Sequence, residues 1–574
     1  MNNDMTDKKN RMKTWKKLCL FLVSVICLLG ISITVFYKIT NYTGRKAWER
    51  YVQESEELNR TAASDTERRY LWLKDIHLPP VDESLNFANY PLFRTVSRLE
   101  NENEFSIDNE ELKPWKEVLE PNGVVGYAGK ADFHRSRRAD YKKFITTERD
   151  PEPFPEENVS PYKQRKKSLA RMAERSKELK EYLDTHTQEE IAQLMLERLE
   201  PGLAAYQDIQ NALEKYPQCR YPLQYEKGFM IETLHLHVLQ KIAAFGYTKA
   251  YANLALGRSD EAVKDILFVM KLANTLSADP HMIYVAVKRG IYEEVLCVIW
   301  EGIESNSWTK ADLKQIQEHL AKTDLYMDTL SGTIGERAIL NEHFFKDPRF
   351  LLNEDPDLSF KEDLLNEIWM NHWGIKDILD SYYVENRIKN CIPLGWNYRA
   401  LLEYNKAIDR LLSFFNLEDK CLNMDILPET INELLNPCQE LLSPFPRKIN
   451  KVPQAVTKYF LGLGISGNRL YGIQRGCEIQ SFINMAQISC ALERFYLENE
   501  KYPDSLDELG ELLPKEKLPH DWFGGKAPRM RLTDTGYILW CSGWNFKDDG
   551  GTRDTRLIQH LSEPQGDWVW EVAR

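Results

Sequence analysis

The sequence lacks several motifs that would point to a reaction. Glu342-His343 has no second histidine to complete H-E-x-x-H, and Ser466 lies outside a G-x-S-x-G frame. The ten cysteines form no C-x-x-C pair and no zinc pattern with histidine, which disfavours a metal thiolate site. Basic residues are not in excess, because 75 Lys and Arg stand against 87 Asp and Glu, and this balance argues against nucleic acid as a partner. No enzymatic activity is therefore predicted.

Long apolar runs are equally scarce. Residues 18–37, LCLFLVSVICLLGISITVFY, form the one uncharged run long enough to cross a bilayer, while GIYEEVLCVIWEGI carries Glu293 and Glu294 and predicts a core helix. A signal peptide would have a shorter apolar region and a small-x-small cleavage site, which KITNYTGRKAWER does not offer. Basic residues are denser before the run than after it. We therefore predict an uncleaved, single-pass signal anchor with a cytoplasmic tail (1–17), a transmembrane helix (18–37) and an ectodomain beyond it.

Eight cysteines lie in this ectodomain, and their spacing leaves two interpretations open. In an oxidising compartment some of them would form disulfides, whose connectivity the spacing does not define. Buried free thiols are an equally good interpretation. The eight are Cys219, Cys297, Cys391, Cys421, Cys438, Cys477, Cys490 and Cys541.

The rest of the chain predicts a mainly α-helical ectodomain. Residues 38–160 mix short helical patches with proline and end in a linker, ERDPEPFPEENVSP, where proline and acidic residues disfavour a helix. A helical-repeat-like domain is expected over 161–345, and a second helical region, richer in aromatic residues, over 346–470. Residues 471–574 are expected to form a C-terminal α+β module.

Helix start signals recur in the repeat-like domain. Capping boxes or acidic variants of them are expected at Thr187–Glu190 and Thr309–Asp312. The stretch AYANLALGRSDEAVKDILFVMKLANTL breaks at Gly257-Arg258 and resembles one tetratricopeptide-type helical hairpin. Because no fixed period follows, we predict an irregular α-solenoid or bundle.

Three letter patterns in the helical regions have structural interpretations that outweigh functional ones. Gly462–Gly467 matches G-x-G-x-x-G but lacks the βαβ context of a dinucleotide site, so a loop is favoured. His235 and His237 are two apart on a helix, where side chains diverge, so joint metal binding is disfavoured. Glu293-Glu294, like Glu189-Glu190, is expected to be a helix cap or a solvated face rather than a glycosidase pair.

The C-terminal module begins with a helix and continues with strands. EIQSFINMAQISCALERFYLENE predicts a helix that stops before Tyr502-Pro503, and Ser505–Glu508 predicts a cap on a short second helix. PRMRLTD, GYILWC and DWVWEV alternate apolar and polar residues between turn signals. A short antiparallel sheet is expected.

The residues of this module resemble a known family. ALERFYLENEKYPDSLDEL and LPHDWFGGKAPRMRLTDTGYILWCSGWNFKDDGG are similar to the globular part of the major pseudopilin of type II secretion systems, over about 90 residues. With NFANYPLF and GDWVW, most of the chain also resembles a group of bacterial single-pass membrane proteins with a long helical ectodomain. These resemblances imply the inner membrane, with the bulk of the chain in the periplasm. Because NRMKTWKKLCLFLV lacks the glycine and the glutamate of a pilin leader, no polymerisation is expected.

The loop GWNFKDDGGT has two interpretations. In the pseudopilin family the corresponding acidic loop binds calcium, and the resemblance carries this role to Asp548 and Asp549, with Asn545 as a further oxygen ligand. The alternative is a structural Asp-Gly turn, which Lys547 beside the acidic pair favours. The loop does not match an EF-hand.

The predicted function is therefore a non-enzymatic, membrane-anchored scaffold or binding protein of the bacterial envelope. The expected partners are envelope proteins or cell-wall glycan, besides the lipid bilayer around the anchor; calcium is the one cofactor considered. The alternative is a periplasmic enzyme or glycan-binding protein that uses a cleft in the helical region. A pocket with converging acids or histidines would favour an enzyme, and a groove of exposed aromatic residues would favour glycan.

Overall fold

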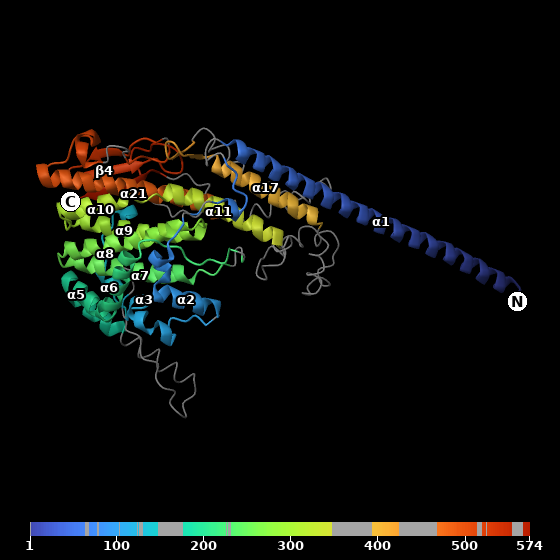
Figure 1. Cartoon of the computed structure of the whole chain (residues 1–574), viewed down its shortest axis with the longest axis horizontal. Helices are drawn as coiled ribbons and strands as arrows, with labels where there is room; N and C mark the ends of the chain where they lie inside the picture. The colour runs from blue at the N-terminus through green and yellow to red at the C-terminus, as the bar shows by residue number, and fades with distance from the viewer. Residues whose placement is uncertain are drawn as a thin grey trace, which may run out of the picture. The chain divides into compact units, whose positions relative to one another are not determined.

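The computed structural model of the chain is mainly helical (Figure 1). It describes residues 2–62, 68–146, 176–346, 393–423 and 468–573, apart from short gaps at 77, 79, 103, 123, 125–129, 226, 228–230, 514–518, 524 and 554–565. The predicted linker, Gly462–Gly467 and most of the second helical region lie outside the described residues. Two compact units emerge: unit 1 comprises Met1–Trp72, Leu340–Arg410 and Ile431–Ser466, and unit 2 comprises Leu73–Ile339, Leu411–Thr430 and Gly467–Arg574.

Unit 1 is built on one very long helix. Helix α1 (Asn2–Thr61) contains the predicted span, whose apolar side chains are exposed, and this segment is long and apolar enough to cross a membrane. The helix does not end with the apolar run: it continues to Thr61, although short patches were expected there. In this later part Trp48, Tyr51 and Ser55 are buried. Helix α17 (Leu394–Leu412) packs against it, with Gly395 close to Gly44 and Asp409 accepting from the Tyr51 hydroxyl. The part of α1 that follows the predicted span, residues 38–61, is therefore held by protein contacts.

The first part of unit 2 consists of short helical segments, as the proline-rich sequence predicted. Two are α-helices, α2 (Pro91–Asn101) and α3 (Lys116–Leu119), of which α2 starts with proline at its first position. The others are 3₁₀ helices: Leu73–Asp75, Glu83–Leu85, Phe87–Asn89, Glu110–Trp115, Phe133–Arg135 and Tyr141–Phe144.

Longer helices form most of unit 2. In chain order these are α5 (Gln188–Leu199), α6 (Leu203–Lys215), α7 (Leu234–Ala255), α8 (Ser259–Asn274), α9 (Met282–Glu304), α10 (Lys310–Leu320) and α11 (Leu325–Lys346), with 3₁₀ turns at Glu200–Gly202 and Thr275–Ala278. The residues of α11 from Leu340 on belong to unit 1. Helices α8, α9, α10 and α21 lie side by side (Figure 1), and α7 packs on α5, α8 and α9. Helix α9 is buried over most of its surface, which confirms the predicted core helix.

Local signals set the ends of these helices. Both predicted capping boxes are formed, by Thr187 with Glu190 at α5 and by Thr309 with Asp312 at α10. Gly257, at φ +69°, separates α7 from α8 where the break was predicted. The α7–α8 hairpin is confirmed, whereas its membership of a solenoid or a bundle stays a prediction.

Residues 468–573 contain the predicted helix and antiparallel sheet. Helix α21 (Asn468–Asn499) starts earlier than expected and ends three residues before Tyr502-Pro503; a capped 3₁₀ helix (Leu506–Leu512) follows. Strands β3 (Arg529–Leu532), β4 (Gly536–Cys541) and β5 (Trp568–Ala573) pair in the order β3-β4-β5, all antiparallel. A minor hairpin joins β1 (Phe415–Asn416) to β2 (Cys421–Leu422).

The C-terminal residues share one core with the helices of unit 2. Helix α21 contacts α9 and α10, and β5 contacts α9. Trp570 packs on Phe133 and donates to the Ser489 hydroxyl, while the Trp300 indole donates to the Glu571 carbonyl. Six cysteines of this unit are buried free thiols, as one of the two interpretations expected: Cys219, Cys297, Cys421, Cys477, Cys490 and Cys541.

Candidate functional site

The loop from Gly543 to Thr552 follows β4, and its acidic residues are bound to the protein itself. The Asp548 carboxylate accepts hydrogen bonds from the Trp540 indole (3.0 Å) and the Gly550 amide (3.1 Å), and it pairs with Arg529 (2.8 Å). The Asn545 side-chain amide donates to Asp549 (2.7 Å). The Trp540 hydrogen bond and the other contacts lower the pKa of Asp548.

This geometry favours the structural turn over the calcium site. Asp548 directs its oxygens to protein donors, and Asn545 uses its side-chain oxygen to accept from the Lys547 amide. Gly550 and Gly551 have φ near +70° and +77°, a backbone conformation that glycine adopts without strain. Among the described residues, no group of three or more His, Cys, Asp or Glu is arranged to hold a metal ion. Calcium binding by Asn545, Asp548 and Asp549 stays a prediction.

A substitution separates the two interpretations. We expect Asp548→Ala to lower the free energy of unfolding of the full chain by about 1–2 kcal/mol, because two hydrogen bonds and a half-exposed ion pair are lost. Thermal melting with saturating calcium or with chelator should give the same midpoint. A calcium-dependent rise of the midpoint that Asp548→Ala abolishes would instead establish the metal site.

The prediction that Glu293 and Glu294 lie on a solvated face is wrong. Both glutamates belong to an ion-pair cluster between α9, α21 and the 3₁₀ turn at Phe133–Arg135. Glu294 pairs with Lys130 (2.5 Å), and Glu293 pairs with Arg475 (2.8 Å), which also contacts Glu478. The helix periodicity is correct, but α21 and the segment from Lys130 to Arg135 cover this face of α9.

The two glutamates have opposite electrostatic environments. Burial opposes ionisation of Glu293, yet the charges of Arg475, His134 and Lys130 hold its pKa below the usual value. Burial raises the pKa of Glu294 more than Lys130 lowers it. Desolvation lowers the pKa of His134, which lies 3.9 Å from Glu293 and 4.0 Å from Glu478. The ion pairs of this cluster connect α9, α21 and the segment that contains Lys130 and His134.

The two histidines at the start of α7 point to different surroundings, as predicted. His235 is buried, stacks on Tyr221 and shares a 2.5 Å hydrogen bond with the Tyr284 hydroxyl. Burial lowers its pKa to about 3, so it is neutral. His237 instead lines a surface pocket.

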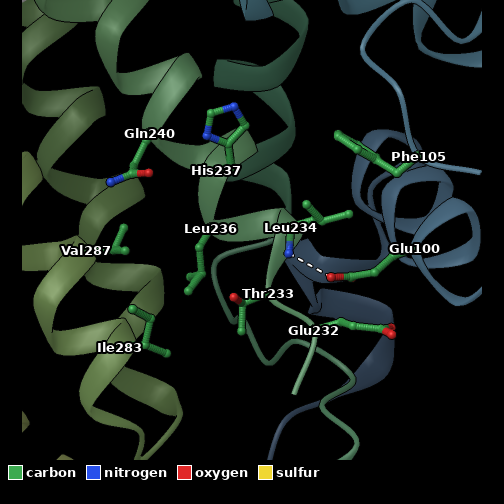
Figure 2. Close-up of a pocket in the computed structure, with 10 residues that line it drawn as sticks. All are labelled: Glu100, Phe105, Glu232, Thr233, Leu234, Leu236, His237, Gln240, Ile283 and Val287. Atoms are coloured by element: carbon green, nitrogen blue, oxygen red, sulfur yellow. Dashed lines mark hydrogen bonds between the residues drawn. The ribbon is translucent and has the colours of Figure 1, made fainter. Parts of the chain in front are cut away.

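This pocket lies between α2, α7 and α9 and has a cavity volume of about 660 Å³ (Figure 2). We call it the α2–α7–α9 pocket. Its described lining consists of Glu100, Phe105, Glu232, Thr233, Leu234, Leu236, His237, Gln240, Ile283 and Val287. Half of these residues are apolar, and the volume lies in the range of ligand sites.

Helix periodicity builds two walls of the pocket. Ile283 and Val287 are four residues apart on α9, and Leu236 and Gln240 are four residues apart on α7. Ile283 keeps 40% of its surface exposed. Figure 2 shows Ile283 and Val287 projecting from α9 toward α7.

The polar residue with the most defined position is Glu100, near the end of α2. It is 8% exposed, and one carboxylate oxygen accepts from the Leu234 amide at 2.8 Å, where α7 begins. Burial raises the pKa of Glu100. Sequence reasoning did not select Glu100, because the pocket forms only when α2 meets α7, 134 residues later in the chain. The sequence signal that could have indicated this residue is an acid on the apolar face of the amphipathic helix α2.

Comparisons of the chain with family models, curated proteins and solved structures gave no match. The likeness to the pseudopilin head and to the bacterial single-pass group stays a prediction from the residues.

Proposed function

We propose that this chain is a single-pass protein of the bacterial inner membrane whose periplasmic ectodomain binds an envelope protein. The N-terminal tail lies in the cytoplasm, α1 crosses the bilayer, and the α2–α7–α9 pocket receives the partner. The exposed apolar part of α1 supports the anchor, and the basic residues before it support the orientation.

The observation that carries the binding function is the lining of this pocket. Its walls offer an apolar surface between two helices, and its polar groups are few and fixed, as in recognition sites. Among its described lining residues only Phe105 is aromatic, which gives little stacking surface for a sugar. Glu100 is turned toward the Leu234 amide rather than toward His237 (Figure 2), an arrangement that suits binding more than acid–base chemistry.

Site-specific photocrosslinking tests the proposal. A photoreactive phenylalanine analogue replaces Ile283 in the full-length protein in its own cells, and the matched control replaces Leu497, an exposed leucine on α21. We expect one discrete adduct with an envelope protein from position 283 and none of the same mass from position 497. Equal labelling from both positions, or none from either, would refute the pocket as a binding site.

A further inference from the structure

The charges lining the α2–α7–α9 pocket have one sign. Glu100 and Glu232 are its ionisable acids, and no lysine or arginine occurs among its described lining residues. Lys227 lies 3.2 Å from Glu232, so Glu232 already has a counter-charge. Glu100 has a backbone donor on one oxygen; the charge of Lys227 also acts on it, but no basic side chain in the described part of the chain is in hydrogen-bond contact with it.

Glu100 is therefore a buried acid that can accept further hydrogen bonds. A carboxylate accepts up to about four hydrogen bonds, and one to the Leu234 amide is present. More than nine-tenths of its surface is buried, so solvent reaches this carboxylate mainly through the pocket itself. A cationic donor that entered the pocket would find a carboxylate already fixed in place, which reduces the entropy lost on binding.

The apolar walls define the rest of the ligand. Ile283 and Val287 face the side of α7 that carries Leu236, and together they accommodate an aliphatic side chain (Figure 2). The volume of about 660 Å³ exceeds what one aliphatic and one cationic side chain fill, so there is room for the backbone that joins them. The pocket thus complements a segment of polypeptide.

We propose that the pocket binds a basic–apolar peptide segment of the envelope protein, with a lysine or arginine at Glu100 and a neighbouring aliphatic side chain against Ile283 and Val287. This inference rests on the proposed function and adds the chemistry of the partner. The ion pair is charge-assisted and largely desolvated, so it supplies specificity for a cation. Desolvation and the charge of Lys241 lower the pKa of His237, which disfavours a competing positive charge on this ring.

Peptide titration tests the inference on the full-length protein in lipid nanodiscs. The probes are fluorescein-labelled hexapeptides with the sequence Ala-Leu-Lys-Leu-Ala-Ala, or with norleucine or glutamate in place of lysine. We expect the lysine peptide to bind roughly tenfold more tightly than the norleucine peptide, because norleucine keeps the apolar stem and loses the charge. The glutamate peptide should bind weakest.

Two charge-neutral variants of the protein serve as a matched pair. Glu100→Gln keeps an oxygen that accepts from the Leu234 amide, so the fold is retained, and it should remove the preference for lysine over norleucine. Glu104→Gln removes the same charge at an exposed position four residues away and should leave the preference unchanged. Equal binding of the three peptides, equal behaviour of the two variants, or no peptide binding at all would overturn the inference. An adduct from position 283 would still support the proposed function in each of those cases.

Discussion

Replacement of Arg475 by methionine should lower the free energy of unfolding by about 3–5 kcal/mol. Arg475 is 15% exposed and contacts both Glu293 and Glu478, and the Glu478 side chain is only 6% exposed. Methionine fills a similar volume, but it leaves two carboxylates without their main counter-charge in a poorly solvated site. Chemical unfolding of the full-length protein in detergent, followed by tryptophan fluorescence, measures the loss.

The pH dependence of this effect has a defined sign. Burial works against the charge on Glu293, but Arg475 and its neighbours bring the net pKa below the usual value. A lowered acid pKa contributes stability above the pKa of the unfolded chain, and this contribution is lost as pH falls through the folded value. The difference between wild type and Arg475→Met should therefore shrink as pH is lowered below about 4.5, the ordinary value for a glutamate.

Two further variants separate charge burial from simple packing. Lys264→Met removes an exposed cation that pairs with Glu261 and should change stability by less than about 1 kcal/mol. Adding Glu478→Gln to Arg475→Met should recover part of the lost stability, because it removes one unpaired charge. A double variant no more stable than the single one would contradict the electrostatic account.

The features predicted correctly from the sequence are local ones. The capping boxes at Thr187 and Thr309, the break at Gly257 and the positions of strands β3 to β5 depend on residues within a few positions of one another. Helix α9 was predicted correctly as well, because its apolar periodicity lies within the helix itself. Such signals determine where an element begins and ends, without defining what covers it.

The errors and omissions involve contacts between distant segments. In the sequence Glu293 and Glu294 resemble a solvated pair, because their partners are distant in the chain. Lys130 lies 163 positions before Glu293, and Arg475 lies 182 positions after it. Residues 38–61 of α1 were expected to break into short patches, because no run of apolar residues there indicates that α17 packs against Tyr51. Glu100 escaped notice because its partners belong to α7 and the pocket exists only in three dimensions.

Gly44→Leu should detach residues 40–61 of α1 from α17 and lower the stability of unit 1 by about 3 kcal/mol. A Cβ on Gly44 would overlap the backbone of Gly395, and one on Gly395 would overlap the carbonyl of Thr40. The two glycines let the helix backbones touch, and the Gly395 amide donates to the Asn41 side chain at 2.8 Å. A leucine forces the backbones apart and breaks this contact.

Hydrogen exchange of the full-length protein in nanodiscs measures the effect, because residues 40–61 should lose protection while residues 18–37 keep it. Gly30→Leu is the matched control: it lies on the same helix, and a Cβ there has no neighbour within 4 Å. The position of the contact gives it a role beyond stability. Asn41 and Gly44 follow the predicted span by only a few residues, so α17 contacts α1 directly after the segment that is expected to cross the bilayer. The same exchange pattern in both variants would contradict the role of this contact in holding residues 40–61.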